Sequence, residues 1–215
     1  MEKYLKMDRR VKTKLIVKKD IETGKEIIEE IVKIHLDGFK GFFLSFLGPG
    51  FLRLLYTCVA SDENGILLVA YVDEKIAGFV CGVIDQESFY KKLLRTKIFH
   101  FARASLAASI KKPAIIMRLL RALKRPKDAT KMSTKTYLMS ICVHPDYQGL
   151  GLGKMLIQDF CVELIKRGTR SFCLTTDRYN NDSVNEFYQR LGFRLVRSFI
   201  TAEGRHMNEY LKLLE

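Results

Sequence analysis

The sequence predicts an α/β (α+β) fold, in which a mixed central β-sheet of six to seven strands is flanked by helices and a basic helical insert separates the third and fourth strands. Three observations support this prediction. Strand and helix patterns alternate after residue 136, an antiparallel hairpin pattern precedes that stretch, and 47% of the 215 residues are hydrophobic, which is enough for one core. We therefore expect a single domain over residues 1–215.

The front half begins with a strand pattern and an amphipathic helix. Ile27, Ile31 and Ile34 recur at helical spacing, which places them on one apolar face. A Gly-Pro-Gly run at 48–50 interrupts the apolar stretch that follows, which predicts two short helices in place of one. The expected elements are a strand at 13–18, a helix at 22–39, two helices within 42–56, and hairpin strands at 65–72 and 75–84.

Residues 86–135 form an insert with a helical pattern and an unusual charge. Residues 89–135 hold fourteen of the 37 Lys and Arg residues and one of the 24 acids, so they account for the whole formal charge of +13. Apolar stripes beside dense basic residues suit an anionic membrane or a lipid-linked substrate, which we expect to contact residues 89–131. The alternative is a solvated helical lid over a substrate pocket. The insert carries no nucleic-acid motif, so nucleic acid is not an expected partner.

The remaining chain alternates strands with helices, as in a sheet covered on both faces. Leu152, Leu156, Phe160 and Leu164 share one face of the first of these helices. The expected strands are 136–143, 171–176, 193–199 and 206–213, and the expected helices are 151–167 and 182–191.

Cysteine usage and the N-terminus indicate a reducing compartment. Five cysteines are scattered without a CxxC pair, so neither a disulfide framework nor a metal site is expected. The first fourteen residues lack the apolar region of a signal peptide, and no run approaches the roughly 18 apolar residues of a membrane-spanning helix. We expect a cytoplasmic protein, with peripheral contact at the inner membrane face if the insert binds lipid.

Residues 143–154 contain the most informative motif, a glycine-rich turn between a predicted strand and a predicted helix. Glycines at 149, 151 and 153 allow backbone amides to turn toward a ligand, and the helix N-terminus favours a negative charge. A phosphate-binding loop of the GxxxxGK[ST] type is excluded, because Met155 follows Lys154 and residue 148 is Gln. The dinucleotide pattern GxGxxG is also excluded by the glycine spacing.

The pattern that fits is Gln-x-x-Gly-x-Gly, formed by Gln148, Gly151 and Gly153, and it resembles the acetyl-CoA loop of the GNAT superfamily of N-acyltransferases. Residues 181–193 read Asn-x5-Phe-Tyr-x-x-Leu-Gly-Phe, which resembles the second signature of that superfamily. The resemblance is specific over 136–199 and looser over the first 85 residues. It implies a GNAT fold and acetyl-CoA as the co-substrate of an N-acetyltransferase.

The resemblance also implies where acetyl-CoA binds. In the family, two parallel strands splay apart and the pantetheine arm lies between them, with strand amides facing the thioester. The glycine-rich loop would hold the pyrophosphate, with added charge from Lys154. Asn181 matches a family asparagine that contacts the CoA arm, or is an ordinary helix cap, and Asn185 could share its role. The expected cofactor-binding residues are Ile141, Cys142, Val143, Gln148, Gly149, Leu150, Gly151, Leu152, Gly153, Lys154, Asn181 and Asn185.

Two residues are the expected catalytic pair. Tyr188 matches the tyrosine that protonates the leaving CoA thiolate in many family members; the alternative is a packing aromatic on an amphipathic helix. The predicted splayed strands carry no carboxylate, so Asp177, just past the second of them, is the nearest candidate for the general base. Asp85 and Glu87 at the exit of the hairpin are further candidates. Each of these acids could instead be a solvated turn residue, with the amine deprotonated through water.

The acceptor implied by the resemblance is a primary amine, attacked directly through a tetrahedral intermediate. The stretches 42–56 and 175–181 are also similar to acetyltransferases that accompany bacterial polysaccharide assembly, which makes a small molecule such as an amino sugar the expected acceptor. Two alternatives stay open. One is a protein or peptide N-terminal acetyltransferase, and the other is a noncatalytic CoA-binding or membrane-surface module. The oligomeric state is not predicted by the sequence.

Overall fold

A seven-stranded mixed sheet runs through the computed structural model, which describes residues 10–24, 26–111, 133–201 and 204–215. The strand order is β1-β2-β3-β4-β5-β7-β6. The strands are β1 (Val11–Leu15), β2 (Gly65–Val72), β3 (Lys75–Val83), β4 (Tyr137–Val143), β5 (Ser171–Asp177), β6 (Arg194–Ile200) and β7 (His206–Leu213). The predicted mixed sheet is therefore confirmed.

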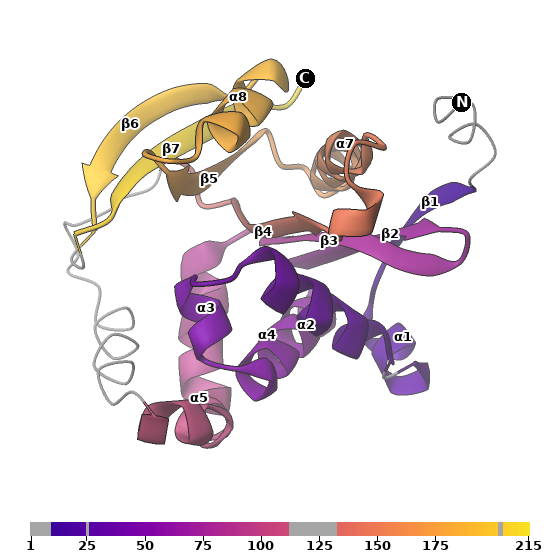
Figure 1. Ribbon diagram of the computed structural model, residues 1–215, viewed down its shortest axis with the longest axis vertical. Coiled ribbons are helices and arrows are strands. Elements are labelled where there is room, and N and C mark those ends of the chain that lie inside the picture. Colours follow the sequence, from indigo (N-terminus) through magenta and orange to yellow (C-terminus); the bar gives the residue numbers. More distant parts are fainter. Residues whose placement is uncertain (1–9, 25, 112–132, 202–203) are drawn as a thin grey trace.

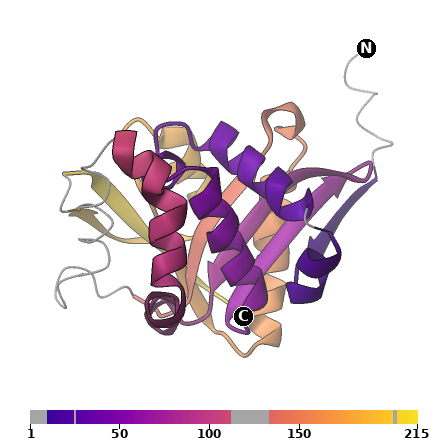
Figure 2. The ribbon, with the colours of Figure 1, turned by 90° about the horizontal axis from the view of Figure 1, so that it is seen from below.

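Helices cover both faces of the sheet (Figure 1). In the order of the chain they are α1 (Lys18–Thr23), α2 (Glu26–Gly38), α3 (Phe43–Phe46), α4 (Pro49–Ser61), α5 (Gln86–Lys111), the 3₁₀ turn η1 (Pro145–Tyr147), α7 (Leu152–Lys166) and α8 (Asp182–Arg190). Helices α2 and α4 pack on what we call the lower face, with α5 beside α4, as Figure 2 shows from below. Helices α7 and α8 pack on the upper face.

Strand pairing divides the sheet into two antiparallel parts. Strands β1 to β4 pair antiparallel in order, and β5, β7 and β6 pair antiparallel with one another. The β2–β3 hairpin turns at Asp73 and Glu74, whose φ angles of 48° and 66° match the two-residue loops that suit twisted hairpins. A single parallel contact between β4 and β5 joins the two parts.

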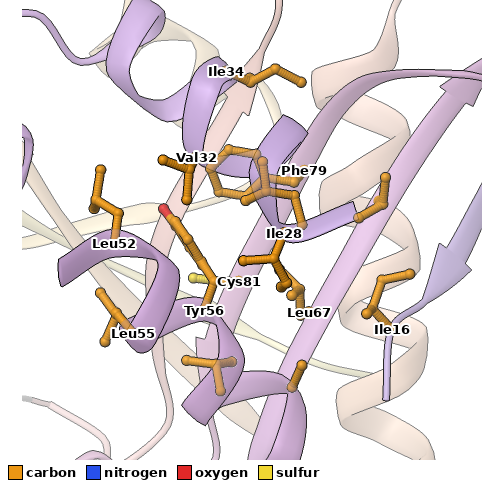
Figure 3. Packing of buried hydrophobic residues seen from close by; sticks show 14 of the residues in the cluster. Ile16, Ile28, Val32, Ile34, Leu52, Leu55, Tyr56, Leu67, Phe79 and Cys81 are labelled. Atoms are coloured by element: carbon orange, nitrogen blue, oxygen red, sulfur yellow. The ribbon is translucent and has the colours of Figure 1, made fainter. Parts of the chain in front are cut away.

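The lower core fixes the helices that follow β1. Val32 of α2 and Leu52 of α4 are buried in one cluster with Leu67 of β2, and Figure 3 shows these side chains interleaved. The Tyr56 ring of α4 meets the Phe79 ring of β3 edge-on at 5.2 Å between centroids, a favourable aromatic geometry. This packing holds α2 and α4 rigidly against β3 and β4.

The upper core fixes α7 and α8. Phe160 of α7 meets Phe172 of β5 edge-on at 5.3 Å, and Leu156 and Leu164 lie fully buried in the same cluster. Tyr188 of α8 also belongs to this cluster. Both helices therefore start at defined positions above the ends of β4 and β5.

The structure corrects two predicted boundaries. The expected helix at 22–39 begins at Glu26, and a separate α1 precedes it, in which the Asp20 carboxylate accepts the Val17 amide at 3.0 Å and Gly24 follows the last residue as C-cap. The first strand runs from Val11 to Leu15 and not from 13 to 18.

The insert between the third and fourth strands is confirmed in its first part by α5. The later part of the expected helical insert, residues 112–132, lies outside the described residues. Within the described part of the chain, no helix combines the length and apolar character that crossing a membrane requires.

Candidate functional site

The connection between β4 and α7 folds as the turn that its glycines predict. Gly149 and Gly151 have positive φ angles of 74° and 77°, a conformation that glycine adopts at little steric cost. A Cβ on Gly153 would come within 3.3 Å of Phe187 of α8. Helix α7 has no side-chain cap at its N-terminus, so its first amides point outward without helical partners. Together with the exposed Lys154, they suit an anion.

Flanking residues hold this turn in place. Leu150 and Leu152 pack with Val72 of β2 and Ala77 of β3, so the turn cannot move away from the sheet. The Gln148 side chain donates to the Val143 carbonyl at 3.5 Å. The backbone amides of the turn are thus held in place by contacts within the protein.

Strands β4 and β5 open from a single point of contact. Tyr137 and Cys173 form the one register pair between them, and the Cys173 amide donates to the Thr136 carbonyl at 3.0 Å. In Figure 1, β5, β7 and β6 lean away from β4, β3 and β2 beyond that point. In an uninterrupted parallel pair, backbone hydrogen bonds would continue along the whole length of both strands. The opening leaves backbone groups of both strands facing a gap that widens toward the glycine-rich turn.

A β-bulge bends β4 within this gap. Cys81 of β3 lies opposite Ser140, but the next residue, Gly82, lies opposite Leu138, so Met139 is the extra residue. Bulges interrupt ladder pairing and re-aim neighbouring groups. Ile141, Cys142 and Val143, the residues predicted to face the thioester, follow directly after this bulge.

The side chains of these three residues pack above and below the sheet. Ile141 and Val143 contact the upper core, and Cys142 contacts the lower core. Helix α2 lies so close to β4 that a Cβ on Gly38 would collide with the Cys142 sulfur. Burial, together with the charge of Asp37, raises the pKa of Cys142 to about 11, so its thiol stays protonated and is a poor nucleophile. The backbone of β4 is therefore what this strand offers to a ligand.

Tyr188 lies on the inner side of α8, only 6% exposed. Its ring meets the Phe193 ring edge-on at 5.3 Å and lies 5.9 Å from that of Tyr210. Burial, reinforced by the nearby Tyr137, raises the pKa of Tyr188. The phenol is therefore protonated at neutral pH and can donate a hydrogen bond. This placement is compatible with both roles that the sequence allows for Tyr188, a packing aromatic and a hydrogen-bond donor.

The two predicted asparagines join β5 to α8. The Asn181 side-chain amide donates to Thr176 Oγ1 at 2.7 Å and to the Asp177 carbonyl at 3.1 Å, which leaves its side-chain oxygen Oδ1 without a partner among the described residues. Asn185 uses both its donors and accepts two hydrogen bonds, from Asn208 and Tyr210. A contact between Asn185 and CoA would have to displace one of these bonds.

The acids proposed as bases are each engaged. Asp177 accepts two 2.8 Å hydrogen bonds from Arg205, a charged contact that occupies both of its oxygens. Asp85 accepts the Ser88 amide at 2.8 Å at the start of α5. Glu87 pairs with Lys91 at 2.6 Å on the surface. Of the three, Asp177 alone ends a strand that borders the gap.

A basic pocket beside the glycine-rich turn extends the site in a way that the sequence analysis missed. It measures ≈ 410 Å³ and lies between α7 and the α8–β6 connection, and no acid lines it. Lys154, Arg190 and Lys212 line it together with Gln158 and Cys161. Arg190 falls inside the second signature, two residues beyond Tyr188. This position is the only feature of the sequence that could have drawn attention to Arg190. Lys212 is 58 residues from Lys154 in the sequence, and only the fold brings them together.

The family of the chain follows from its sequence. Residues 29–193 match the family described as Acetyltransferase (GNAT) family. The chain therefore belongs to the GNAT acetyltransferase family, as its two signatures predict, and this membership supports acetyl-CoA as co-substrate. No curated protein sequence matches the chain.

Solved structures share the fold at low sequence identity. An N-acetyltransferase from Staphylococcus aureus Mu50 superposes with a TM-score of 0.59 at 15% identity, covering 96% of this chain and 99% of its own. A GNAT acetyltransferase from Streptococcus pneumoniae gives 0.56 at 18%, covering 96% and 100%. The ribosomal-protein-S18-alanine N-acetyltransferase from Escherichia coli gives 0.54 at 16%, covering 96% and 95%. At these identities the similarity establishes the fold, which agrees with the predicted GNAT architecture.

Proposed function

We propose that this protein transfers an acetyl group from acetyl-CoA to a primary amine of a small molecule. The observation that carries the proposal is the opening of β4 and β5 beside the glycine-rich turn at 148–154. A parallel strand pair that separates after one contact provides an extended backbone surface for a thin, amide-containing chain. The helix start at its open end provides a site for phosphates.

The proposed binding of acetyl-CoA uses backbone groups first. The amides of residues 149–154 and Lys154 hold the pyrophosphate, and Leu150 and Leu152 anchor that loop. Arg190 and Lys212, in the neighbouring basic pocket, supply charge for the remaining phosphate of CoA. The side-chain oxygen of Asn181 accepts a hydrogen bond from the pantetheine arm, while Asn185 acts by positioning α8. The backbone of 141–143 faces the thioester carbonyl, where each well-placed donor contributes about 3 kcal/mol to the transition state.

The proposed reaction is a direct transfer. The amine nitrogen attacks the thioester carbon, a tetrahedral intermediate forms, and the carbon–sulfur bond breaks to release the CoA thiolate. The acceptor's ammonium gives one proton to a base before the attack, and the attacking nitrogen gives a second proton to the sulfur, so the products are an N-acetyl compound and free CoA. A thiol has a pKa of about 8.5, below that of the buried Tyr188 phenol. Tyr188 therefore assists by hydrogen-bonding the sulfur as charge develops, and the amine supplies the proton.

Asp177 is the proposed proton acceptor. It ends β5 at the open side of the gap, but Arg205 occupies both of its oxygens. These contacts must be displaced before either oxygen can accept a proton from the acceptor. The acceptor must therefore change the surroundings of Asp177 before the amine can attack.

The acceptor class is proposed from the open end of the gap. The Arg205 side chain lies 5.4 Å from the Phe42 ring centroid as well as against Asp177, so contacts cross this end and favour a small amine such as an amino sugar. A protein or peptide N-terminus is the second candidate and would need a wider groove. A noncatalytic CoA-binding module is the third.

One assay separates these candidates. CoA thiol release would be followed with acetyl-CoA and a panel of amino sugars, small amines and N-terminal peptides, beside calorimetry of acetyl-CoA binding. Turnover with small amines supports the proposal, and turnover with peptides alone supports the second candidate. Tight acetyl-CoA binding without turnover on any amine supports a binding module. An absence of acetyl-CoA binding would contradict the whole proposal.

We also propose that α5 contacts an anionic membrane surface or a lipid-linked substrate from the cytoplasmic side. Phe99 on α5 is 85% exposed, and Arg95 and Arg103 stand one helical turn before and after it. Aromatic and basic side chains on one helix face suit the boundary between lipid headgroups and acyl chains. The lid alternative would instead bury this face against the acceptor.

A further inference from the structure

Three segments that are distant in the sequence meet at the open end of the gap. Asp177 ends β5, Arg205 lies between β6 and β7, and Phe42 lies between α2 and α3. The Arg205 guanidinium donates to both oxygens of Asp177 at 2.8 Å and lies 5.4 Å from the Phe42 ring centroid. We call this set the Phe42–Arg205–Asp177 bridge.

The bridge joins the two sides of the gap. Phe42 is tied to α2 through an edge-on contact with Phe39 at 5.5 Å, and the end of α2 presses on β4 at Cys142. Asp177 belongs to the other side, because β5 pairs with β7. Arg205 therefore spans from the β4 side to the β5 side.

The bridge also lies on the lower face of the sheet, opposite α7 and α8. Alternate residues of a strand point to opposite faces, and Phe172 and Leu174 of β5 point into the upper core. Thr175 and Asp177 consequently point to the lower face, where Thr175 Oγ1 lies 2.7 Å from the Tyr137 hydroxyl. An amine that approaches the gap from this face, away from the glycine-rich turn, meets the bridge first.

The ion pair within the bridge is accessible enough to exchange partners. The side chains of Arg205 and Asp177 are 34% and 28% exposed. Partly exposed ion pairs of this kind contribute little net stability, so a ligand that supplies a new partner to each member can replace the contact. An amine without an anionic group, here called a neutral amine, cannot replace the contact. It offers no new partner to the Arg205 guanidinium, which would then compete with the amine for the Asp177 carboxylate.

We propose that the acceptor carries an anionic group, a phosphate or a carboxylate, near its amine, and that Arg205 is the residue that selects it. This inference rests on the proposed acetyl transfer. The anionic group takes both donors of Arg205 in a bidentate contact. Asp177 is then released to pair with the ammonium of the acceptor and to accept its proton. One internal ion pair is thus replaced by two between protein and acceptor.

The surroundings of the bridge fit an anionic acceptor. The Arg178 amide donates to the His206 carbonyl at 2.9 Å, and the His206 ring lies 5.1 Å from that of Tyr179. Arg178 is exposed and follows Asp177 in the chain, and its guanidinium lies 5.2 Å from the Tyr179 ring centroid. Positive charge at a binding mouth attracts anionic substrates and raises their local concentration.

The test compares matched amines with the wild-type protein and three variants. The acceptor pairs are glucosamine with glucosamine 6-phosphate, and ethanolamine with O-phosphoethanolamine; β-alanine adds a carboxylate arm. The variants are Arg205→Gln, Arg205→Lys, and Arg178→Gln as a neighbouring control. The readout is the ratio of kcat/KM for the anionic amine to that for the neutral amine.

We expect the wild type to favour the anionic member by roughly 10- to 100-fold, the gain of a bidentate charged contact. Arg205→Gln should bring the ratio close to one, mainly through a higher KM for the anionic amine. Arg205→Lys should keep part of the preference, and Arg178→Gln should keep most of it. Inorganic phosphate should compete with the acceptor in the wild type and not in Arg205→Gln.

Two outcomes would overturn the inference, and they are distinguishable. A ratio that is equal in wild type and Arg205→Gln, with turnover present, refutes the role of Arg205 and leaves acetyl transfer intact. No turnover on any amine, despite a folded protein, refutes the proposed function and this inference with it. If Arg205→Gln does not fold, Arg205→Lys decides the question, because both the preference for the anionic amine and the competition by inorganic phosphate should be weaker in it than in the wild type.

Discussion

The phenol of Tyr188 is the side chain whose removal most directly tests the chemistry. Burial raises its pKa, so it acts as a donor throughout the neutral range. Tyr188→Phe should lower kcat on the order of 10²-fold and leave the affinity for acetyl-CoA unchanged in calorimetry. Tyr71→Phe on β2 serves as the control, because Tyr71 lies outside the gap. Equal kcat values for Tyr188→Phe and wild type would reduce Tyr188 to a packing residue.

His35 on α2 makes the stability of the protein depend on pH. It is 2% exposed, its Nδ1 lies 2.6 Å from the Tyr56 hydroxyl, and its Nε2 has no partner among the described residues. Burial lowers its pKa from 6.5 to about 4. Below pH 6.5 His35 binds a proton in the unfolded chain but not in the folded chain. The free energy of unfolding therefore has its full value above that pH and falls as the pH decreases toward 4. The loss reaches about 3 kcal/mol at most.

Urea unfolding at several pH values between 7.5 and 4.5 would measure this dependence. His35→Phe should be less stable than wild type at neutral pH, because it loses the contact with Tyr56, but its stability should fall less steeply with acid. His206→Gln, which changes an exposed histidine, should keep the wild-type slope. An unchanged slope in His35→Phe would mean that other groups cause the acid sensitivity.

At the scale of elements, helix α7 offers a matched pair of glycines at its two ends. Gly151 and Gly168 have positive φ angles of 77° and 75°, and a Cβ at either would meet no atom within 4 Å. Alanine should therefore cost each site about 1 kcal/mol of backbone strain. Only Gly151→Ala should also weaken acetyl-CoA binding, by roughly tenfold, since it disturbs the amides at the helix start. Calorimetry beside thermal unfolding measures both effects, and equal affinities would argue against a pyrophosphate at this turn.

The elements that local chemistry determines are the ones that the sequence predicts well. The Asp73-Glu74 turn, the Gly-Pro-Gly break before α4 and the glycine turn before α7 each depend on neighbouring residues, and each lies where it is expected. The division of α1 from α2 is missed, because apolar periodicity cannot detect that Asp20 accepts the Val17 amide. Boundaries depend on single hydrogen bonds, which the hydrophobic pattern does not encode.

The site is predictable only where it is continuous in the sequence. The loop at 148–154 and the helix at 182–190 carry their own motifs. Arg205, which holds Asp177, lies 28 residues away from it, and nothing in the local sequence distinguishes it from other surface arginines. Glu209 is another such case: it is fully buried on β7, paired with Arg197 at 2.6 Å, and accepts the Ser133 amide where the chain returns from the insert. These ion pairs join residues on different strands and loops, so they can be predicted only when the order of the strands in the sheet is known.

For the whole molecule, the distribution of charge separates the proposed acetyl-CoA site from the basic insert. The chain outside residues 89–135 has no formal net charge, and its sheet and helices form the proposed acetyl-CoA site. The start of the insert packs on α4, where Phe101 meets Phe51 at 4.9 Å between ring centroids. We propose that residues 1–215 act as one domain in which α5 orients a basic surface relative to the acceptor side, since only the short α3 separates α4 from the loop that carries Phe42.

That arrangement predicts binding to anionic membranes through the outer face of α5. Lys91 and Lys92 are paired with Glu87 and Asp62, whereas Arg95 and Arg103 have no ion pair with any described residue. Each basic residue near such a surface contributes about 1 kcal/mol, and burying an exposed Phe adds about 2 kcal/mol. The triple variant Arg95→Gln/Phe99→Ala/Arg103→Gln should therefore bind phosphatidylserine vesicles at least roughly 10²-fold more weakly, as measured by co-sedimentation.

The control for this experiment lies on the opposite side of the sheet. Val162 on α7 is exposed and has Lys166 one turn beyond it, so Val162→Ala/Lys166→Gln removes similar chemistry from a helix not proposed to meet lipid. This variant should bind vesicles as the wild type does, and added salt should weaken the wild type because exposed charges are screened. If both variants bind vesicles equally well, the outer face of α5 is not the contact. If wild type binds duplex DNA and ignores vesicles, the basic insert recognises phosphate in a nucleic acid and the membrane proposal is wrong.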